Sequence, residues 1–236
     1  MNRTPGAAPV YLLAGSSRAR RTERDPLLAR AIASCGVTEP SIAYIGAASD
    51  DDRSFFKMIS GHLLACGAGE VTLAPLAGGR VKLDSTRSIL ESADAIFVSG
   101  GDVEAGMAVI EGRKMLSFLR KLRETGTPFI GLSAGSIMLA REWIVWDDPN
   151  DDATSSVFPC MGFADIRCDT HGEEEGWEEL RALMLLAPEG SVGYGIPTGA
   201  GLCIYPDGTL EALGSPVHCI GKINRTVKRC MDLEPC

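Results

Sequence analysis

Residues 127–141 read Thr-Pro-Phe-Ile-Gly-Leu-Ser-Ala-Gly-Ser-Ile-Met-Leu-Ala-Arg, and the rest of the chain is organised around this stretch. The apolar pair Phe129 and Ile130 predicts a short buried strand, and the apolar run after Gly135 predicts a helix. Ser133 stands between them in the pattern G-x-S-x-G, which is typical of a nucleophile elbow, a serine on a sharp strand-to-helix turn. The alternative is a small-residue turn in an ordinary α/β protein. We therefore treat Ser133 as a candidate nucleophile.

Segments of strand length and helical segments alternate on the N-terminal side of this turn. The expected strands are 10–14, 41–45, 70–73, 95–98 and 129–132. The expected helices are 26–33, 53–65, 84–92 and 103–124, with Asp84 as a cap and a break near Gly112. Fivefold alternation predicts an α/β fold, in which a mainly parallel sheet carries helices on both faces in three layers.

The C-terminal part of the chain is less regular. Residues 142–159 are rich in acids and predict a polar loop, followed by a strand at 163–169 and a helix at 173–186. Residues 192–214 predict antiparallel strands with a hairpin turn at Asp207-Gly208, and 217–223 a last strand. No linker interrupts the chain, so we expect a single domain over residues 1–236, with a peripheral tail after about residue 224.

The overall composition limits the function. The net charge of −8 argues against nucleic acid and favours small-molecule or peptide substrates. No apolar run is long enough to span a membrane, and the N-terminus does not read as a signal peptide. The eight cysteines form no C-x-x-C pair, so no metal site is expected. Reduced thiols in a cytoplasmic protein are the expectation.

Functional loops of parallel sheets lie at the carboxyl ends of the strands. Three loops there are candidates, at 46–52, 99–103 and 132–136. An elbow serine needs a base, and His171, at the predicted end of a strand, is favoured over His218 and His62. The base also needs an acid to orient it, and the sequence does not choose among four candidates: Asp147, Asp148, Asp151 and Asp152. The backbone amides of Ala134 and of Gly100-Gly101 are candidates for an oxyanion hole, with a phosphate-binding turn as the alternative for the two glycines.

Four segments occur together in order, at 96–102, 129–136, 169–171 and 193–199. In this combination the chain resembles the dipeptidase E and cyanophycinase family of serine peptidases, whose fold is similar to flavodoxin-like class I glutamine amidotransferase domains. The resemblance implies Ser133 as nucleophile, His171 as base, and oxyanion amides from Gly101 and Ala134. It implies Asp148 as the acid, with Asp151 next, and Gly100 and Asp102 beside the substrate. It also implies cleavage of small peptides after an aspartyl residue without metal or cofactor, and it leaves open whether the chain forms a homodimer.

Three features of the sequence depart from the family pattern. Val103 stands where cyanophycinase-like members carry glutamine, and Thr198 where an acid is usual. Acids at 173–175, 178 and 179 replace arginines that hold substrate carboxylates, which argues against the aspartate-rich polymer cyanophycin as substrate. Candidates for binding an aspartyl carboxylate are then Arg18, Arg20, Arg21 and Arg53, unless these are a solvated charge run. An esterase or amidase, or a binding module that keeps the fold, are the alternative functions.

Overall fold

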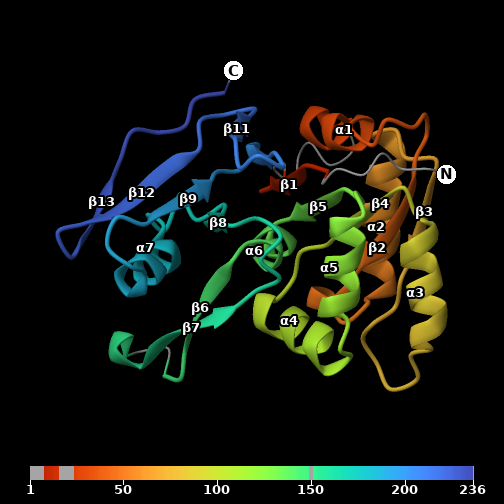
Figure 1. The fold of residues 1–236 in the computed structure, drawn as a ribbon, viewed down its shortest axis with the longest axis horizontal. Helices are drawn as coiled ribbons and strands as arrows, with labels where there is room; N and C mark the ends of the chain where they lie inside the picture. The colour runs from red at the N-terminus through yellow and green to blue at the C-terminus, as the bar shows by residue number, and fades with distance from the viewer. Residues whose placement is uncertain (1–7, 16–23, 149–150, 236) are drawn as a thin grey trace.

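A seven-stranded sheet forms the centre of the structure, a computed structural model that describes residues 8–15, 24–148 and 151–235 (Figure 1). Its strands lie in the order β11-β10-β1-β5-β4-β2-β3. Strands β1, β5, β4, β2 and β3 run parallel, whereas β10 pairs antiparallel with both β1 and β11. The bounds are β1 Val10–Leu13, β2 Ser41–Ile45, β3 Glu70–Leu73, β4 Ala95–Val98, β5 Phe129–Leu132, β10 Gly201–Ile204 and β11 Leu210–Leu213.

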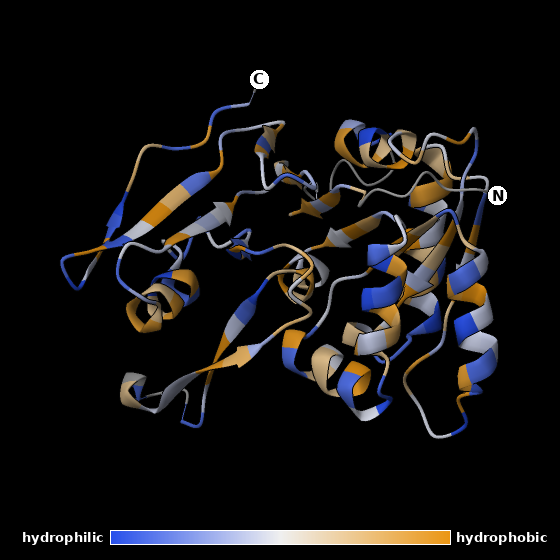
Figure 2. Ribbon diagram, in the orientation of Figure 1, coloured by the Kyte–Doolittle hydropathy of each residue, from blue (hydrophilic) through white to orange (hydrophobic). Residues whose placement is uncertain are grey.

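Helices cover both faces of this sheet, as predicted. Successive strand residues point to opposite faces, so Leu12 packs in one apolar cluster and its neighbour Tyr11 in another. The first cluster takes in α3, α4, α5 and α6, and the second takes in α1 and α2. Blue and orange bands alternate along α3 and α5, as amphipathic helices require (Figure 2). The bounds are α1 Pro26–Ala33, α2 Arg53–Ala65, α3 Leu83–Ser92, α4 Val103–Gly112, α5 Leu116–Glu124 and α6 Ala134–Leu139.

Two details of these helices test the local predictions. The break near Gly112 is confirmed, because α4 ends there and Lys114 adopts a left-handed φ of 56° before α5. The prediction that Asp84 caps the helix is wrong, because α3 begins at Leu83 after Lys82 and Asp84 lies in its first turn. No helix in the described ranges is long and apolar enough to cross a lipid bilayer.

A second sheet of four strands, in the order β13-β12-β9-β8, lies beside the first (Figure 1). Its elements are β8 Arg167–Thr170, β9 Val192–Ile196, β12 His218–Ile223, β13 Thr226–Arg229 and the covering helix α7 Glu178–Leu186. Helix α7 begins later than predicted because Gly176 and Trp177 adopt left-handed φ values of 65° and 64°. Residues after 224, expected to be peripheral, pair as β13 with β12.

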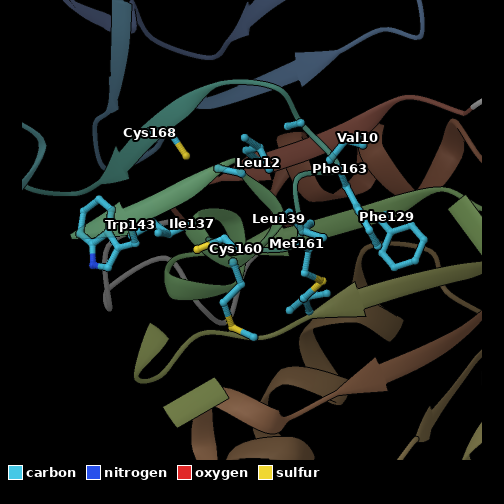
Figure 3. Close-up of a cluster of buried hydrophobic side chains, with 14 of the residues drawn as sticks. Val10, Leu12, Phe129, Ile137, Leu139, Trp143, Cys160, Met161, Phe163 and Cys168 are labelled. Atoms are coloured by element: carbon cyan, nitrogen blue, oxygen red, sulfur yellow. The ribbon is translucent and has the colours of Figure 1, made fainter. Parts of the chain in front are cut away.

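One cluster of buried side chains connects the two sheets. Figure 3 shows Leu12 and Phe129 of the large sheet in the same cluster as Trp143 and Cys168. The single-domain organisation stays a prediction, and this continuous apolar cluster supports it.

The prediction of a polar loop at 142–159 is wrong. Strand β6 Glu142–Trp146 pairs with β7 Ser155–Pro159 in an antiparallel hairpin, with a 3-10 turn η3 Asp152–Thr154 before β7. The reason is local, since Trp143, Ile144, Val145 and Trp146 are aromatic or β-branched and suit a strand. Only the connection between the strands is acid-rich.

Candidate active site

Ser133 occupies a strained turn between β5 and α6. Its backbone angles, φ 53° and ψ −125°, lie in a region that residues other than glycine rarely adopt. Its amide donates to the carbonyl of Leu13 at 2.8 Å. The glycines of the motif make this turn possible. A Cβ on Gly135 would lie 2.1 Å from the carbonyl oxygen of Val98, so only glycine fits there. The backbone therefore has the geometry of a nucleophile elbow.

His171 lies directly after β8 and contacts this serine. Its Nε2 is 2.7 Å from Oγ of Ser133, and its amide donates to the carbonyl of Ile196 at 2.9 Å. Like Ser133 it has a left-handed φ, of 46°. Of the other histidines, His62 lies in α2 and lines a cavity that Ser133 also lines, and His218 lies in β12 with its ring 5.5 Å from that of Trp177.

The turn after β4 faces the nucleophile. A Cβ on Gly100 would lie 3.1 Å from Cβ of Ser133, and one on Gly101 would lie 1.9 Å from the carbonyl oxygen of Ala48. With a φ of 143°, Gly101 has no room for a side chain. The Asp102 carboxylate caps α4 by accepting from the amide of Ala105 at 2.8 Å.

Residues 46–52, expected among the functional loops, line neither of the cavities described below. They support the glycine turn from behind, because the carbonyl of Ala48 accepts from the amide of Asp102 at 2.8 Å. The Asp51 carboxylate accepts from the amides of Leu76 and Ala77, both at 2.7 Å. This loop is therefore a structural support.

Two cavities meet at Gly101, Ser133 and His171. The first, which we call the acidic cavity, has a volume of about 700 Å³ and is lined by Ala134, Trp143, Trp146 and a set of carboxylates. Those carboxylates belong to Asp102, Glu104, Asp169, Glu175, Glu178 and Glu179. The second, which we call the apolar cavity, has a volume of about 710 Å³. It is lined by apolar residues such as Leu13, Leu28, Phe55, Ile59 and Leu132, together with Arg24 and His62.

The predicted acids lie in the connection of the β6–β7 hairpin. Asp147, Asp148 and Asp151 are exposed, and none of them lines either cavity. The backbone amide of Asp148 donates to Oγ1 of Thr154 at 3.0 Å, and the amide of Ala153 donates to the Asp151 carboxylate at 2.9 Å. The hairpin reaches the acidic cavity with its tryptophans instead.

Glu173 lies close to the histidine, which the sequence analysis did not anticipate. Its carboxylate accepts from the amide of Thr198 at 3.0 Å. Partial burial raises the pKa of Glu173, but hydrogen bonding by Thr198 and the nearby His171 ring outweigh that effect and lower it. The resemblance predicts an acid at the position of Thr198, and a neighbouring loop brings the Glu173 carboxylate to the Thr198 amide instead.

Asp169 is a second unanticipated group. It precedes His171 by two residues on β8, is 5% exposed and lines the acidic cavity. One oxygen accepts from the amide of Thr170 at 2.6 Å. Burial raises the pKa of Asp169 to about 7 against the opposing Thr170 hydrogen bond, and the carboxylates of Glu179, Glu175 and Glu173 add to the rise.

The predicted arginines are only partly described. Arg18, Arg20 and Arg21 lie outside the described residues. Arg53 is exposed at the start of α2 and lines neither cavity. Arg24, which was not among the predicted site residues, lines the apolar cavity. No pattern in the sequence distinguishes it from the neighbouring arginines.

An elbow serine in contact with a histidine, at the carboxyl ends of a parallel sheet, defines an α/β protein with a site of the serine-hydrolase class. Residues 11–210 match peptidase family S51, and the chain belongs to this family. The predicted membership in the dipeptidase E family and the predicted fold class are thereby confirmed.

The chain is also similar to individual proteins of more than one kind. The chain is 28% identical over 127 residues to Peptidase E of Haemophilus influenzae, covering 50% of this chain and 57% of the relative. It is 31% identical over 112 residues to pyridoxal 5'-phosphate synthase subunit PdxT of Methanopyrus kandleri, covering 42% and 55%. These matches span little more than half the length of the relatives. A crystal structure of a peptidase from an acI-B1 Actinobacterium shares the fold, with a TM-score of 0.68, 15% identity and 98% of each chain covered.

Proposed function

We propose that this protein is a serine peptidase that cleaves small peptides, with Ser133 as nucleophile and His171 as general base. The observation that carries the proposal is the distance of 2.7 Å between Oγ of Ser133 and Nε2 of His171, at a strained turn that opens into two cavities. A serine hydroxyl is a poor nucleophile by itself, and a histidine in hydrogen-bond contact removes its proton as it attacks.

The proposed reaction has two halves. Oγ of Ser133 attacks the peptide carbonyl while Nε2 of His171 takes the hydroxyl proton, and the amides of Gly101 and Ala134 are the candidates that stabilise the oxyanion. The histidine then gives this proton to the leaving amine as the C–N bond breaks. A water molecule attacks the acyl-enzyme with His171 again as base, which releases the carboxylic acid and restores Ser133.

For the acid that stabilises the protonated histidine, two residues compete. Asp148 is favoured by the family resemblance and by its place in the chain between Ser133 and His171. Glu173 is favoured by its position two residues after His171, whose ring makes a minor contribution to the lowered pKa of the glutamate. The amide of Thr198 also holds the Glu173 carboxylate in place. We propose Glu173 as the acid, with Asp148 as the alternative.

Specificity for an aspartyl residue is part of the proposal and requires a cation that faces the substrate carboxylate. Arg24 lines the apolar cavity beside Ser133, which supports it as that cation. Gly100, which also lines this cavity, and Asp102, which lines the acidic cavity, are proposed to contact the substrate. Arg18, the candidate from the sequence, remains a proposal outside the described residues. The cytoplasmic location and the homodimer stay predictions.

Two measurements test the proposed function. A fluorophosphonate probe should label the intact protein at Ser133, and labelling should disappear in Ser133→Ala. A panel of aspartyl dipeptides, alanyl dipeptides and simple esters then separates the activities. Hydrolysis of aspartyl dipeptides supports the proposal, ester cleavage alone identifies an esterase, and neither labelling nor turnover identifies a binding module.

A further inference from the structure

We propose that the apolar cavity is a subsite for a large apolar side chain, carried by the residue that directly precedes the aspartyl residue of the substrate. This inference rests on the proposed peptidase function and names the substrate class, a peptide extended at its amino end by a residue such as leucine or phenylalanine. The competing occupant is a free N-terminal aspartyl residue, with nothing before it.

The first argument is the position and size of the cavity. Its lining includes Ser133 and His171, so a group attached to the scissile carbonyl can enter it. Its volume of about 710 Å³ lies within the range of roughly 300–1,000 Å³ that is usual for sites of drug-sized ligands. The side chain of an aspartyl residue consists only of a methylene and a carboxylate, which leaves most of this volume for a second group.

The second argument is the chemistry of the cavity wall, which is built by the first turn of α1, one face of α2 and the ends of two strands. Leu13 and Leu132 are paired in register where β1 and β5 end, directly before the nucleophile. The lining residues of α2 recur at helical spacing and therefore share one face of the helix. The large apolar side chains of the lining include Leu13, Leu28, Phe55, Met58, Ile59 and Leu132. An apolar side chain that packs on this wall leaves water, which is favourable in proportion to the area buried.

The third argument is an apolar side chain of the wall that is itself open to water. Met58 is 44% exposed and lines the cavity. A ligand that covers its side chain removes this apolar surface from water, and the flexible thioether adapts to partners of different shape. Met58 therefore supports an apolar occupant that can be aliphatic or aromatic.

The fourth argument is the charge of the lining, which gives no preference to a free amino terminus. Histidines apart, the charged side chains among the described lining residues are Arg24 and Asp25, whose formal charges cancel. Oδ1 of Asp25 caps α1 by accepting from the amides of Leu27 at 2.9 Å and Leu28 at 3.1 Å. Arg24 can pair with the aspartyl carboxylate, but the lining has no excess of negative charge for an α-ammonium group.

The test measures binding without turnover, so that it does not depend on the proposed peptidase activity. Isothermal titration calorimetry on Ser133→Ala compares acetyl-leucyl-aspartyl-amide with acetyl-asparaginyl-aspartyl-amide, because leucine and asparagine have nearly the same shape and the two compounds have the same charge. We expect the leucyl compound to bind roughly tenfold more tightly or better. This advantage should not shrink at high salt, since it involves no charge. Equal affinities, or no binding of the leucyl compound, would overturn the subsite.

Variants in the Ser133→Ala background locate the binding. Met58→Gln and Phe55→Ala should each reduce the advantage of the leucyl compound severalfold, whereas the conservative Met58→Leu should keep it. Leu64→Gln is the matched control, because Leu64 lies in the same helix, is 47% exposed and lines neither cavity. An advantage that survives both Met58→Gln and Phe55→Ala places the apolar group elsewhere and overturns the proposal.

Two further ligands separate the competing assignments. If aspartyl-amide with a free amino group binds as tightly as acetyl-leucyl-aspartyl-amide, the occupant is a free N-terminal aspartyl residue and the proposal is wrong. If leucine improves affinity only in acetyl-aspartyl-leucyl-amide, the apolar side chain lies on the leaving side and the proposal is also wrong. Preferred binding of acetyl-leucyl-aspartyl-amide by a protein that hydrolyses no peptide would leave the subsite standing and reject the proposed function alone.

Discussion

Oγ of Ser133 and Nε2 of His171 lie 2.7 Å apart, although 38 residues separate them in the chain. Ser133 follows β5 of the large sheet, and His171 follows β8 of the second sheet. The contact therefore depends on how the two sheets pack, and the apolar cluster that connects them holds the pair in place.

Replacement of the nucleophile tests the covalent mechanism. Ser133→Ala should lower kcat by several orders of magnitude, because no other group can form the acyl-enzyme. Ser136→Ala is the control in the same turn. The buried Ser136 hydroxyl donates to the carbonyl of Leu13 at 2.9 Å, so this variant should lose about 1 kcal/mol of stability and keep fluorophosphonate labelling. Unchanged turnover in Ser133→Ala would exclude the mechanism.

The choice of acid is tested by neutral isosteres. Glu173→Gln keeps an oxygen that can accept from the Thr198 amide but removes the charge that stabilises protonated His171, so kcat should fall by roughly two orders of magnitude or more. Asp148→Asn and the control Glu174→Gln should change kcat little. A loss confined to Asp148→Asn would return the role to Asp148.

The glycine turn is tested by adding one methyl group. Gly101→Ala should destabilise the protein by a few kcal/mol and reduce activity, because the new Cβ would lie 1.9 Å from the carbonyl of Ala48. Gly61→Ala is the control, since Gly61 lies in α2 with nothing within 4 Å of its Cβ position. That change should stabilise the helix by about 0.5–1 kcal/mol. Chemical denaturation of both variants measures the difference.

The buried carboxyl of Asp169 predicts a pH-dependent stability. Its pKa of about 7 is above the unfolded value, so its contribution to stability is complete below the unfolded pKa and is lost as pH rises through 7. Asp169→Asn cannot ionise and keeps an acceptor for the Thr170 amide. The melting temperature of Asp169→Asn relative to the native protein should therefore rise between pH 5 and pH 8. A difference that stays constant over this range would show that Asp169 is ionised throughout, and Glu174→Gln serves as the exposed control.

Arg24 and Arg53 offer a matched test of carboxylate recognition. Arg24→Gln should lower kcat/KM for an aspartyl dipeptide more than for its asparaginyl analogue, because Arg24 lines the apolar cavity at Ser133. Arg53→Gln should leave the ratio of kcat/KM for the aspartyl dipeptide to kcat/KM for the asparaginyl dipeptide unchanged, since Arg53 is exposed and lines neither cavity. In the native protein this ratio should also shrink at high salt. An effect of Arg53→Gln equal to that of Arg24→Gln would reject this role for Arg24.

Much of the fold could be predicted because its signals are local. The alternation of apolar strands and amphipathic helices up to residue 132 appears with bounds that differ by few residues. The errors occur where a short segment carries conflicting signals. Residues 142–159 combine strand-forming residues with acids, and the prediction of a loop followed from the acids alone. The tail after 224 forms a strand only because β12 offers it an edge.

The sequence by itself determined the elbow, since Gly131, Ser133 and Gly135 specify a turn whose crowding is set by residues a few positions apart and by the strand beside it. It also indicated His171, from its position at a strand end. Only the tertiary structure decided which groups from distant segments surround this pair. Asp169 and Glu173 each lie two residues from His171 in the chain, whereas Arg24 and the tryptophans of the β6–β7 hairpin reach the site from separate elements. Their distances from Ser133 depend on long-range packing, which no local pattern of residues encodes.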